Sequence, residues 1–190
     1  YNGSSWSEDG DLNTARAVIA GAGTQTAGIG FGGNTGSVSA LTELYNGSSW
    51  TETGDLSTAR DQLAAAGTTT AGLAFGGANS TPAVTNSTEE FGGSSWTSGG
   101  NLNSARRYLA GFGIQTAALA TGGAEPTIVA KTEQYNGTSW TEVADLNQAR
   151  RELSGSGTTT AGLAFAGGPP AYALTEQWDG SSWTEVNDLG

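Results

Sequence analysis

The sequence contains no cysteine, no histidine and no methionine. The absence of cysteine excludes a disulfide framework, a thiolate nucleophile and a zinc site of the usual kind. The absence of histidine removes the commonest general base and the commonest transition-metal ligand. Most standard hydrolase and oxidase sites therefore cannot be built from these residues, and we expect a protein without catalytic residues and without a metal or other cofactor.

Basic residues are scarce, with 7 Lys and Arg against 18 Asp and Glu and a formal net charge of −11. Nucleic acids and anionic membrane surfaces bind clusters of cations, and the sequence shows no such cluster. The apolar runs, such as residues 73–75, are far too short to span a bilayer. We therefore expect no nucleic-acid partner and no membrane insertion.

A short segment that ends in tryptophan occurs five times along the 190 residues. The spacings between these tryptophans are 44, 46, 44 and 43 residues. The tryptophans themselves are Trp6, Trp50, Trp96, Trp140 and Trp183. A nearly constant period of this length is typical of repeat folds, in which the length of the chain reflects the number of repeats rather than the number of domains.

An arginine, a glycine and a glutamate mark each repeat at constant distances. The arginine follows the tryptophan by 10 residues, the glycine follows the arginine by 17, and the glutamate precedes the next tryptophan by 7. Only the interval from the glycine to the glutamate changes, at 10, 12, 10 and 9 residues. The sequence therefore predicts a scaffold of constant length with one variable loop in each repeat.

The second repeat shows the pattern within one unit. Its segments 59–66, 70–77, 88–91 and 94–98 are separated by glycine-containing turns or by the variable loop. Leu73 and Phe75 alternate with Gly72 and Ala74, and this period of two places large and small side chains on opposite faces of a strand. An interior glycine costs a helix about 1 kcal/mol, so a helical interpretation fails. The prediction is an all-β fold of four-stranded antiparallel units of about 44 residues.

A glycine-containing dipeptide precedes each tryptophan. The dipeptides are Asn2-Gly3, Asn46-Gly47, Gly92-Gly93, Asn136-Gly137 and Asp179-Gly180. All of them tolerate positive φ at both positions, which predicts two-residue type I′ hairpin turns. Three of the dipeptides also begin N-glycosylation acceptor sequences. The turn is the favoured interpretation, because the other two copies keep the turn residues and lose the acceptor sequence.

A sheet with large side chains on one face cannot bury that face alone, whereas copies stacked around an axis can. Glycine pairs end one segment of the repeats, and an aromatic residue and then tryptophan follow; the pairs are Gly32-Gly33, Gly76-Gly77 and Gly122-Gly123. This order resembles the kelch class of β-propeller. The repeats are shorter than those of the family and lack its aliphatic-Tyr-aliphatic run. The copper oxidases of this class use cysteine and histidine ligands, which this chain does not contain.

The exact residues of the repeats suggest a narrower resemblance. The string Tyr-Asn-Gly-Ser-Ser-Trp-Thr-Glu, with Asp-Leu-Asn-Thr-Ala-Arg, is similar to repeats in virion and tail-associated proteins of marine bacteriophages. The propeller resemblance implies an outer hairpin of a preceding blade at residues 1–12. It then implies four blades, at residues 13–56, 57–102, 103–146 and 147–190. We expect this propeller domain to be part of a longer chain.

The repeated charged and aromatic residues are expected to be structural. We expect the tryptophans to lie in the core between blades, and the arginines and glutamates to form ion pairs. These charged residues are Arg16, Arg60, Arg106, Arg150, Glu43, Glu89, Glu133 and Glu176. Asp55 with Arg60, and Asp145 with Arg150, are further candidate pairs. Four equal copies favour structural ion pairs over a catalytic site.

The variable loops are the candidate binding surface, because recognition is usually built on loops that differ on a common scaffold. They offer hydroxyls, amides, a carboxylate and an aromatic ring, which suit a sugar. The candidate contacts are Asn34, Thr35, Ser37, Asn79, Ser80, Thr81, Glu125, Thr127 and Tyr172. The alternative is that these loops are merely tolerant segments in solvent.

These observations favour a non-enzymatic structural and recognition module on a virion or in the extracellular space. Its expected partners are other virion or surface proteins and cell-surface glycans, within a larger assembly. One alternative is a carbohydrate-active propeller enzyme that uses Asp or Glu, although no unique carboxylate pair stands out. The other is a purely architectural spacer. Asp9-Gly10-Asp11 hints at calcium, but the rest of a calcium-binding loop is missing, so we expect no metal.

Overall fold

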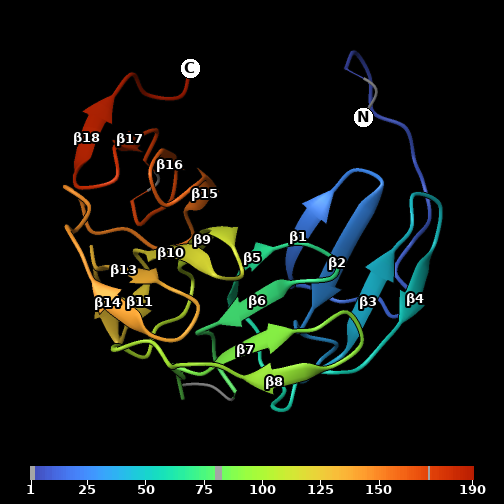
Figure 1. Cartoon of the computed structure of the whole chain (residues 1–190). Helices are drawn as coiled ribbons and strands as arrows, with labels where there is room; N and C mark the ends of the chain where they lie inside the picture. Colours follow the sequence, from blue (N-terminus) through green and yellow to red (C-terminus); the bar gives the residue numbers. More distant parts are fainter. Residues whose placement is uncertain (1–2, 80–82, 171) are drawn as a thin grey trace.

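The structure is a computed structural model that describes residues 3–79, 83–170 and 172–190. Figure 1 shows four twisted sheets that follow one another along the chain and stand side by side around a central axis. The sheets do not close into a ring, and the described residues contain strands and turns but no helix. The predicted all-β fold of four-stranded antiparallel blades is confirmed.

Each blade is a meander of four antiparallel strands. The first blade contains β1 (Ala20–Thr24), β2 (Ala27–Phe31), β3 (Thr42–Tyr45) and β4 (Trp50–Glu52). The second contains β5 (Ala64–Gly67), β6 (Gly72–Phe75), β7 (Thr88–Phe91) and β8 (Trp96–Ser98). The third contains β9 (Ala110–Ile114), β10 (Ala117–Thr121), β13 (Thr132–Tyr135) and β14 (Trp140–Glu142). The fourth contains β15 (Ser154–Gly157), β16 (Gly162–Phe165), β17 (Thr175–Trp178) and β18 (Trp183–Val186).

The first strand of each blade faces the axis, so β1, β5, β9 and β15 are neighbours at the centre. These strands consist mostly of glycine, alanine and serine, and small residues allow the backbones to approach closely. A Cβ atom at Gly111 would clash with the ring of Phe75 and would lie 2.7 Å from the backbone oxygen of Ala65. The small residues of the inner strands are therefore required by the packing of the neighbouring blade.

The inner strand of the second blade is shorter than the segment 59–66 that the sequence predicts. It begins at Ala64, because Gln62 has a left-handed backbone with φ of 56° that interrupts the extended conformation. Before it, Asp61 makes an isolated antiparallel bridge to Ala78. Asp61 and Gln62 therefore belong to the connection at the end of the blade rather than to the strand.

The predicted two-residue type I′ turns are wrong. Tyr45 pairs with Trp50, so four residues connect β3 to β4, and of the dipeptide only Gly47 has positive φ, at 97°. The side-chain oxygen Oδ1 of Asn46 accepts the backbone N–H groups of Ser48 and Ser49, both at 3.0 Å. Because this side chain fixes the turn from within, a second residue with positive φ is unnecessary.

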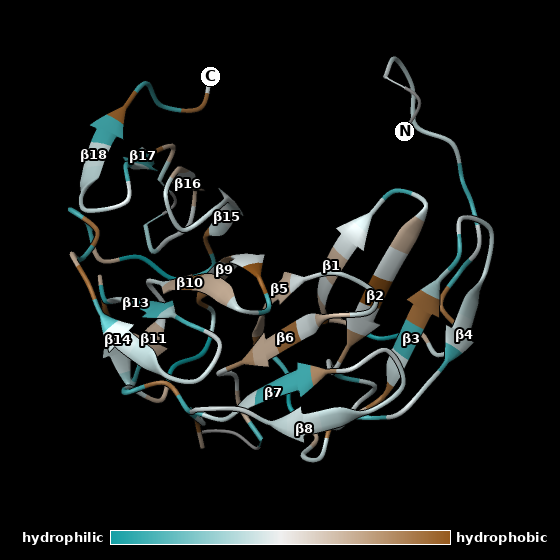
Figure 2. Ribbon diagram, in the orientation of Figure 1, coloured by the Kyte–Doolittle hydropathy of each residue, from teal (hydrophilic) through white to brown (hydrophobic). Residues whose placement is uncertain are grey.

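The cores lie between the blades, as the alternation of large and small residues predicts. Leu73 and Phe75 of the second blade pack with Ala118 and Ala120 of the third, in one buried cluster. Ala74 points the other way and joins the cluster between the first and second blades. Figure 2 shows the apolar residues along β2, β6 and β10, in the middle of the blades. Large side chains of one blade thus cover small ones of the next.

The tryptophans also link consecutive blades through their ring N–H groups. Trp96 donates to the hydroxyl of Thr42 at 2.9 Å, and Trp140 donates to that of Thr88 at 3.0 Å. Trp183 repeats the contact with Thr132 at 3.2 Å. Each of these bonds runs from the outer strand of one blade to the third strand of the preceding one. A buried indole N–H needs such a partner, so the bond fixes the register of the two blades.

The first two tryptophans differ from the others. Trp50 is partly buried and donates its ring N–H to the backbone oxygen of Gly10 at 3.0 Å. Trp6, which the sequence places in the core, is 84% exposed. Within the described part of the expected hairpin 1–12, residues 3–12 form no strand. This segment instead runs alongside the first blade (Figure 1).

The turn in the second blade allows a test of its mechanism. At Gly92, where the other turns carry Asn or Asp, the nearest atom to an added Cβ lies 3.9 Å away, and φ is not in the positive range. We expect Gly92→Asn to raise the free energy of unfolding by about 1 kcal/mol, since the new side chain caps two N–H groups and restricts the unfolded chain. Urea unfolding measures the change.

The neighbouring glycine is the matched control. Gly93 has φ of 93°, which side chains rarely adopt. Gly93→Ala is expected to lower the free energy of unfolding by about 1 kcal/mol. Equal effects of the two substitutions would show that the turn does not work in this way.

Candidate functional site

The variable loops and the links between blades lie at the same end of the blades. The loop between the second and third strands is bonded to the link that follows, since Gly77 N–H donates to Arg106 O at 2.8 Å and Gly123 N–H to Arg150 O at 2.8 Å. We call this end the loop face. Within the described residues it comprises 34–38, 78–79, 83, 124–127, 169–170 and 172 of the variable loops, and the two residues after each repeated arginine.

Each repeated arginine holds the base of its variable loop. In the third blade, Nη1 of Arg106 donates to Gly122 O at 2.8 Å and to Lys131 O at 2.7 Å, which are the two ends of the loop. Its Nη2 donates to Oε1 of Glu133 at 2.9 Å. Oε2 of Glu133 accepts the backbone N–H of Asn103 at 2.7 Å, which ties in the link. We call this unit the Arg–Glu clamp.

The clamp recurs in all four blades. The Arg–Glu distance is 2.8 Å for Arg16 with Glu43, for Arg60 with Glu89 and for Arg150 with Glu176. All four arginine side chains are fully buried, and the glutamates are at most 3% exposed. Burial lowers the pKa of Arg60 and Arg106, and the charges of Glu89 and Glu133 oppose that shift.

The clamp is not fully satisfied. The Nε atoms of Arg60 and Arg106 are buried without a hydrogen-bond partner. An unpaired buried N–H costs free energy, so the net gain from each ion pair is smaller than its geometry suggests. A substitution that removes one partner should destabilise the fold by more than the pair stabilises it, because it would leave an uncompensated charge in the interior.

The candidate ion pairs of Asp55 with Arg60 and of Asp145 with Arg150 do not form, because both aspartates accept backbone N–H groups instead. Asp55 Oδ1 accepts the backbone N–H of Thr42 at 3.0 Å, and Asp145 Oδ1 accepts that of Thr132 at 3.0 Å. The aspartates thus tie the link to the third strand, while the arginines take the glutamates.

Two residues after each clamp arginine, the backbone takes part in a chain of hydrogen bonds between neighbouring blades. Val18, Gln62, Tyr108 and Glu152 all have left-handed backbones with φ between 54° and 57°. Tyr108 N–H donates to Gln62 O at 2.9 Å, and Glu152 N–H donates to Tyr108 O at 2.8 Å. This conformation is strained for side chains of this size, and strain of this kind often marks functional sites. We call these four residues the mouth residues.

Three of the mouth residues, Gln62, Tyr108 and Glu152, directly precede residues that line a cavity between the inner strands. The next residue in each inner segment, namely Leu63, Leu109 or Leu153, lines a cavity of about 280 Å³ together with the small residues of the inner strands. The mouth residues differ in all four blades, unlike the clamps beside them. The loop face therefore has variable side chains at its centre as well as in its loops.

Two arginines and one tyrosine form a cluster at this mouth. The guanidinium carbon of Arg107 lies 5.4 Å from the centroid of the Tyr108 ring, and that of Arg151 lies 5.6 Å from it. Both distances are within the range of cation–π attraction. Arg107 Nη1 also donates to Oε1 of Gln62 at 3.3 Å. We call Arg107, Tyr108 and Arg151 the Arg–Tyr cluster.

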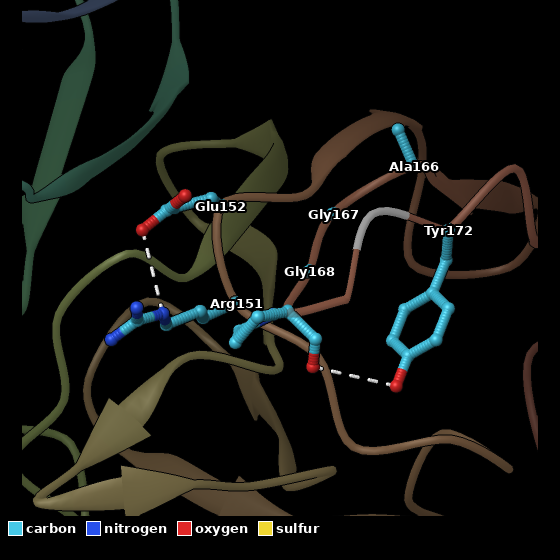
Figure 3. Close-up of a pocket in the computed structure, with 7 residues that line it drawn as sticks. Arg151, Glu152, Ala166, Gly167, Gly168 and Tyr172 are labelled. Atoms are coloured by element: carbon cyan, nitrogen blue, oxygen red, sulfur yellow. Dashed lines mark hydrogen bonds and ion pairs between the residues drawn. The ribbon is translucent and has the colours of Figure 1, made fainter.

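A pocket of about 400 Å³ adjoins this cluster (Figure 3). Arg151 and Glu152 line one side, and Pro169 and Tyr172 of the fourth variable loop line the other. The Nε atom of Arg151 lies 3.4 Å from Oε1 of Glu152, and the Tyr172 hydroxyl lies 3.5 Å from Pro169 O. The pocket thus combines a guanidinium, a carboxylate and an aromatic ring.

The other predicted binding residues lie on separate loops. Asn34 is tied down, because its Nδ2 donates to Asp61 Oδ2 at 3.0 Å and its Oδ1 accepts Gly36 N–H at 2.8 Å. Thr35 and Ser37 are exposed at the tip of the same loop, and Asn79 is exposed on the second. Ser80 and Thr81 lie outside the described residues.

The loop of the third blade has more structure than the sequence predicts. A short ribbon forms there from β11 (Ala124–Glu125) and β12 (Thr127–Ile128). Glu125 pairs with Lys131 at 2.7 Å, and Thr127 is exposed. Of the predicted binding residues, the structure brings Tyr172 into one pocket with Arg151 and Glu152.

The sequence reasoning missed the Arg–Tyr cluster. The signal was present, because the two residues that follow the repeated arginine read Ala-Val, Asp-Gln, Arg-Tyr and Arg-Glu in the four repeats. Variable residues next to a constant residue indicate a recognition surface as much as variable loops do. It was overlooked because the segments before the arginine are nearly identical and suggested that the whole link was framework.

Among the described residues, no three His, Cys, Asp or Glu side chains lie close enough together to hold a metal ion. The described residues also contain no helix long and apolar enough to cross a membrane. In comparisons with known proteins, no protein-family model matches the chain, and no curated protein is significantly similar to it.

Removing one charge from a clamp should be costly. We expect Glu133→Gln to lower the free energy of unfolding by about 3–5 kcal/mol, because Arg106 keeps its charge in the interior. The double variant Arg106→Met with Glu133→Leu should recover part of this loss, since no buried charge remains. Arg107→Gln, at the partly exposed neighbouring arginine, is the control and should change stability by less than about 1 kcal/mol.

Urea unfolding of the four proteins measures these differences. If Glu133→Gln cost no more than Arg107→Gln, the clamp would not be a buried ion pair of structural weight.

Proposed function

We propose that this chain is a non-enzymatic structural and recognition module that binds a glycan through its loop face. The observation that carries the proposal is the contrast between constant clamps and variable surface on the same face. Each clamp fixes the two ends of a loop, as Arg106 does with Gly122 and Lys131, and leaves the residues between them free to differ. Such a rigid frame with exchangeable loops suits recognition.

The pocket beside Tyr172 supports a sugar as the ligand. Sugars bind where an aromatic ring can cover their apolar face and where polar groups can take their hydroxyls. Tyr172 offers the ring, Arg151 and Glu152 offer a donor and an acceptor, and the pocket of about 400 Å³ is of a size for one or two sugar units. Its openness to solvent suits the end or side of a longer glycan.

The carboxylates support a binding role over an enzymatic one. The four buried glutamates repeat in equal copies and are each occupied by an arginine. A glycosidase needs a pair of carboxylates that face one bond of the substrate. The carboxylate in the pocket, Glu152, lies beside Arg151 and is 53% exposed on its side chain. Such a group suits a hydrogen-bond acceptor for a ligand.

The proposed setting is a virion or another extracellular surface. The basis is the resemblance of the repeats to kelch-type blades and to repeats of bacteriophage virion and tail-associated proteins. In that setting the blades would contact other virion or surface proteins within a larger assembly, while the loop face points to cell-surface glycans. A net charge of −11 would keep the module from binding other polyanions indiscriminately.

A glycan array compared across variants tests the proposal. We expect the protein to bind a subset of glycans, and Tyr172→Ala to weaken that binding by about tenfold, the loss of one good contact. Ile114→Ala is the control, because this residue is 56% exposed at the far end of the third blade, beside the hairpin of β9 and β10. An array without a bound glycan, or equal loss in both variants, would contradict the proposal.

A further inference from the structure

The basic residues of this chain are distributed unevenly between the interior and the loop face. Of the 7 Lys and Arg, four arginines are buried in clamps. Lys131 pairs with Glu125 at 2.7 Å. The remaining two, Arg107 and Arg151, both lie in the Arg–Tyr cluster. In an acidic protein, the cations that remain for a ligand are therefore gathered at one place.

The two arginines are held in position before any ligand arrives. Tyr108 is fixed by the backbone bonds on both sides of it, at 2.9 Å to Gln62 O and at 2.8 Å from Glu152 N–H. Both guanidinium groups lie near its ring, at 5.4 and 5.6 Å. Two like charges beside one ring repel each other, and an anion between or beside them would relieve that repulsion.

The acidic groups nearby do not neutralise both arginines. Asp61 is buried and accepts a hydrogen bond from Asn34. Glu152 contacts Arg151 at 3.4 Å, and its side chain is 53% exposed. Within the described residues, Arg107 makes no ion pair, and its hydrogen-bond partner Gln62 is neutral. Arg107 is thus without a direct carboxylate contact, and Arg151 is held only by a long, partly exposed contact to Glu152.

We infer that the ligand of the loop face is an acidic glycan, with a sugar carboxylate bound by Arg107 and Arg151. This inference rests on the proposed function and adds the chemical class of the sugar. A guanidinium binds a carboxylate through two parallel hydrogen bonds, which gives orientation as well as attraction. Arg151 lines the pocket of Tyr172 and also flanks Tyr108, so one residue joins the anion site to the sugar-stacking site.

The overall charge restricts the kind of anion. With a net charge of −11, the protein repels dense polyanions, so a nucleic acid or a heavily sulfated chain is a poor fit. A glycan with a single carboxylate on each acidic sugar places one negative charge at the cluster and neutral hydroxyls elsewhere. A uronic acid is therefore the ligand class that the charges favour.

A trisaccharide with a single galacturonic acid unit, and the methyl ester of the same trisaccharide, separate the contribution of the charge from that of the sugar. In calorimetric titrations we expect the acid to bind about tenfold or more tightly than the ester, the strength of one charge-assisted contact. The double variant Arg107→Gln with Arg151→Gln should remove this preference. Arg107→Lys with Arg151→Lys should keep part of it. A higher salt concentration should weaken the binding of the acid and leave the binding of the ester unchanged.

The outcomes distinguish the inference from the proposed function. Equal binding of acid and ester, or a preference that survives in the glutamine variant, would overturn the inference and leave glycan recognition in place. Binding of a glutamate-rich peptide at the same arginines, without binding of the trisaccharide, would overturn it in favour of a protein partner. If a glycan array also shows no neutral ligand, the proposed function fails as well. Circular dichroism of each variant confirms that it is folded.

Discussion

The buried Arg–Glu pair is the interaction on which this structure depends. One guanidinium joins both ends of a loop to the third strand, and the glutamate joins that strand to the link before the blade. The pair can be buried only if every distance around it is kept, which explains the constant spacings of 17 and 7 residues. Loop length can change because the clamp in the third blade touches only Gly122 and Lys131, at the ends of its loop.

The stacking of the blades follows from a second constraint, which is volume. Phe75 packs against Trp140 of the next blade with ring centroids 4.8 Å apart. In the third blade the equivalent of Phe75 is Thr121, and Phe112 of the inner strand supplies a ring instead, 6.4 Å from Trp183. In the fourth blade the equivalent leucine Leu163 is 40% exposed, whereas Leu73 is fully buried.

The fold could be predicted from the sequence because the same weak residue pattern recurs in every repeat. The alternation around Leu73 predicts strands, and four copies of it predict blades. Sequence reasoning failed where a single backbone angle decides, as at Gln62, whose left-handed φ shortens β5. It also failed where a side chain replaces a backbone preference, as Asn46 does in its turn. The Arg–Tyr cluster was missed because the nearly identical link residues suggested framework, and because Arg151 reaches Tyr108 from the next blade, which spacing within one repeat does not reveal.

The most direct test of the clamp is hydrogen exchange in the variant Arg106→Met. We expect the largest acceleration of backbone amide exchange in residues 103–105 and 122–131, because this loop and link lose their common anchor. Residues 33–41, held by the intact pair of Arg16 and Glu43, serve as the control within the same molecule. Unchanged exchange at 122–131, or equal acceleration in all four repeats, would contradict the central role of the clamp.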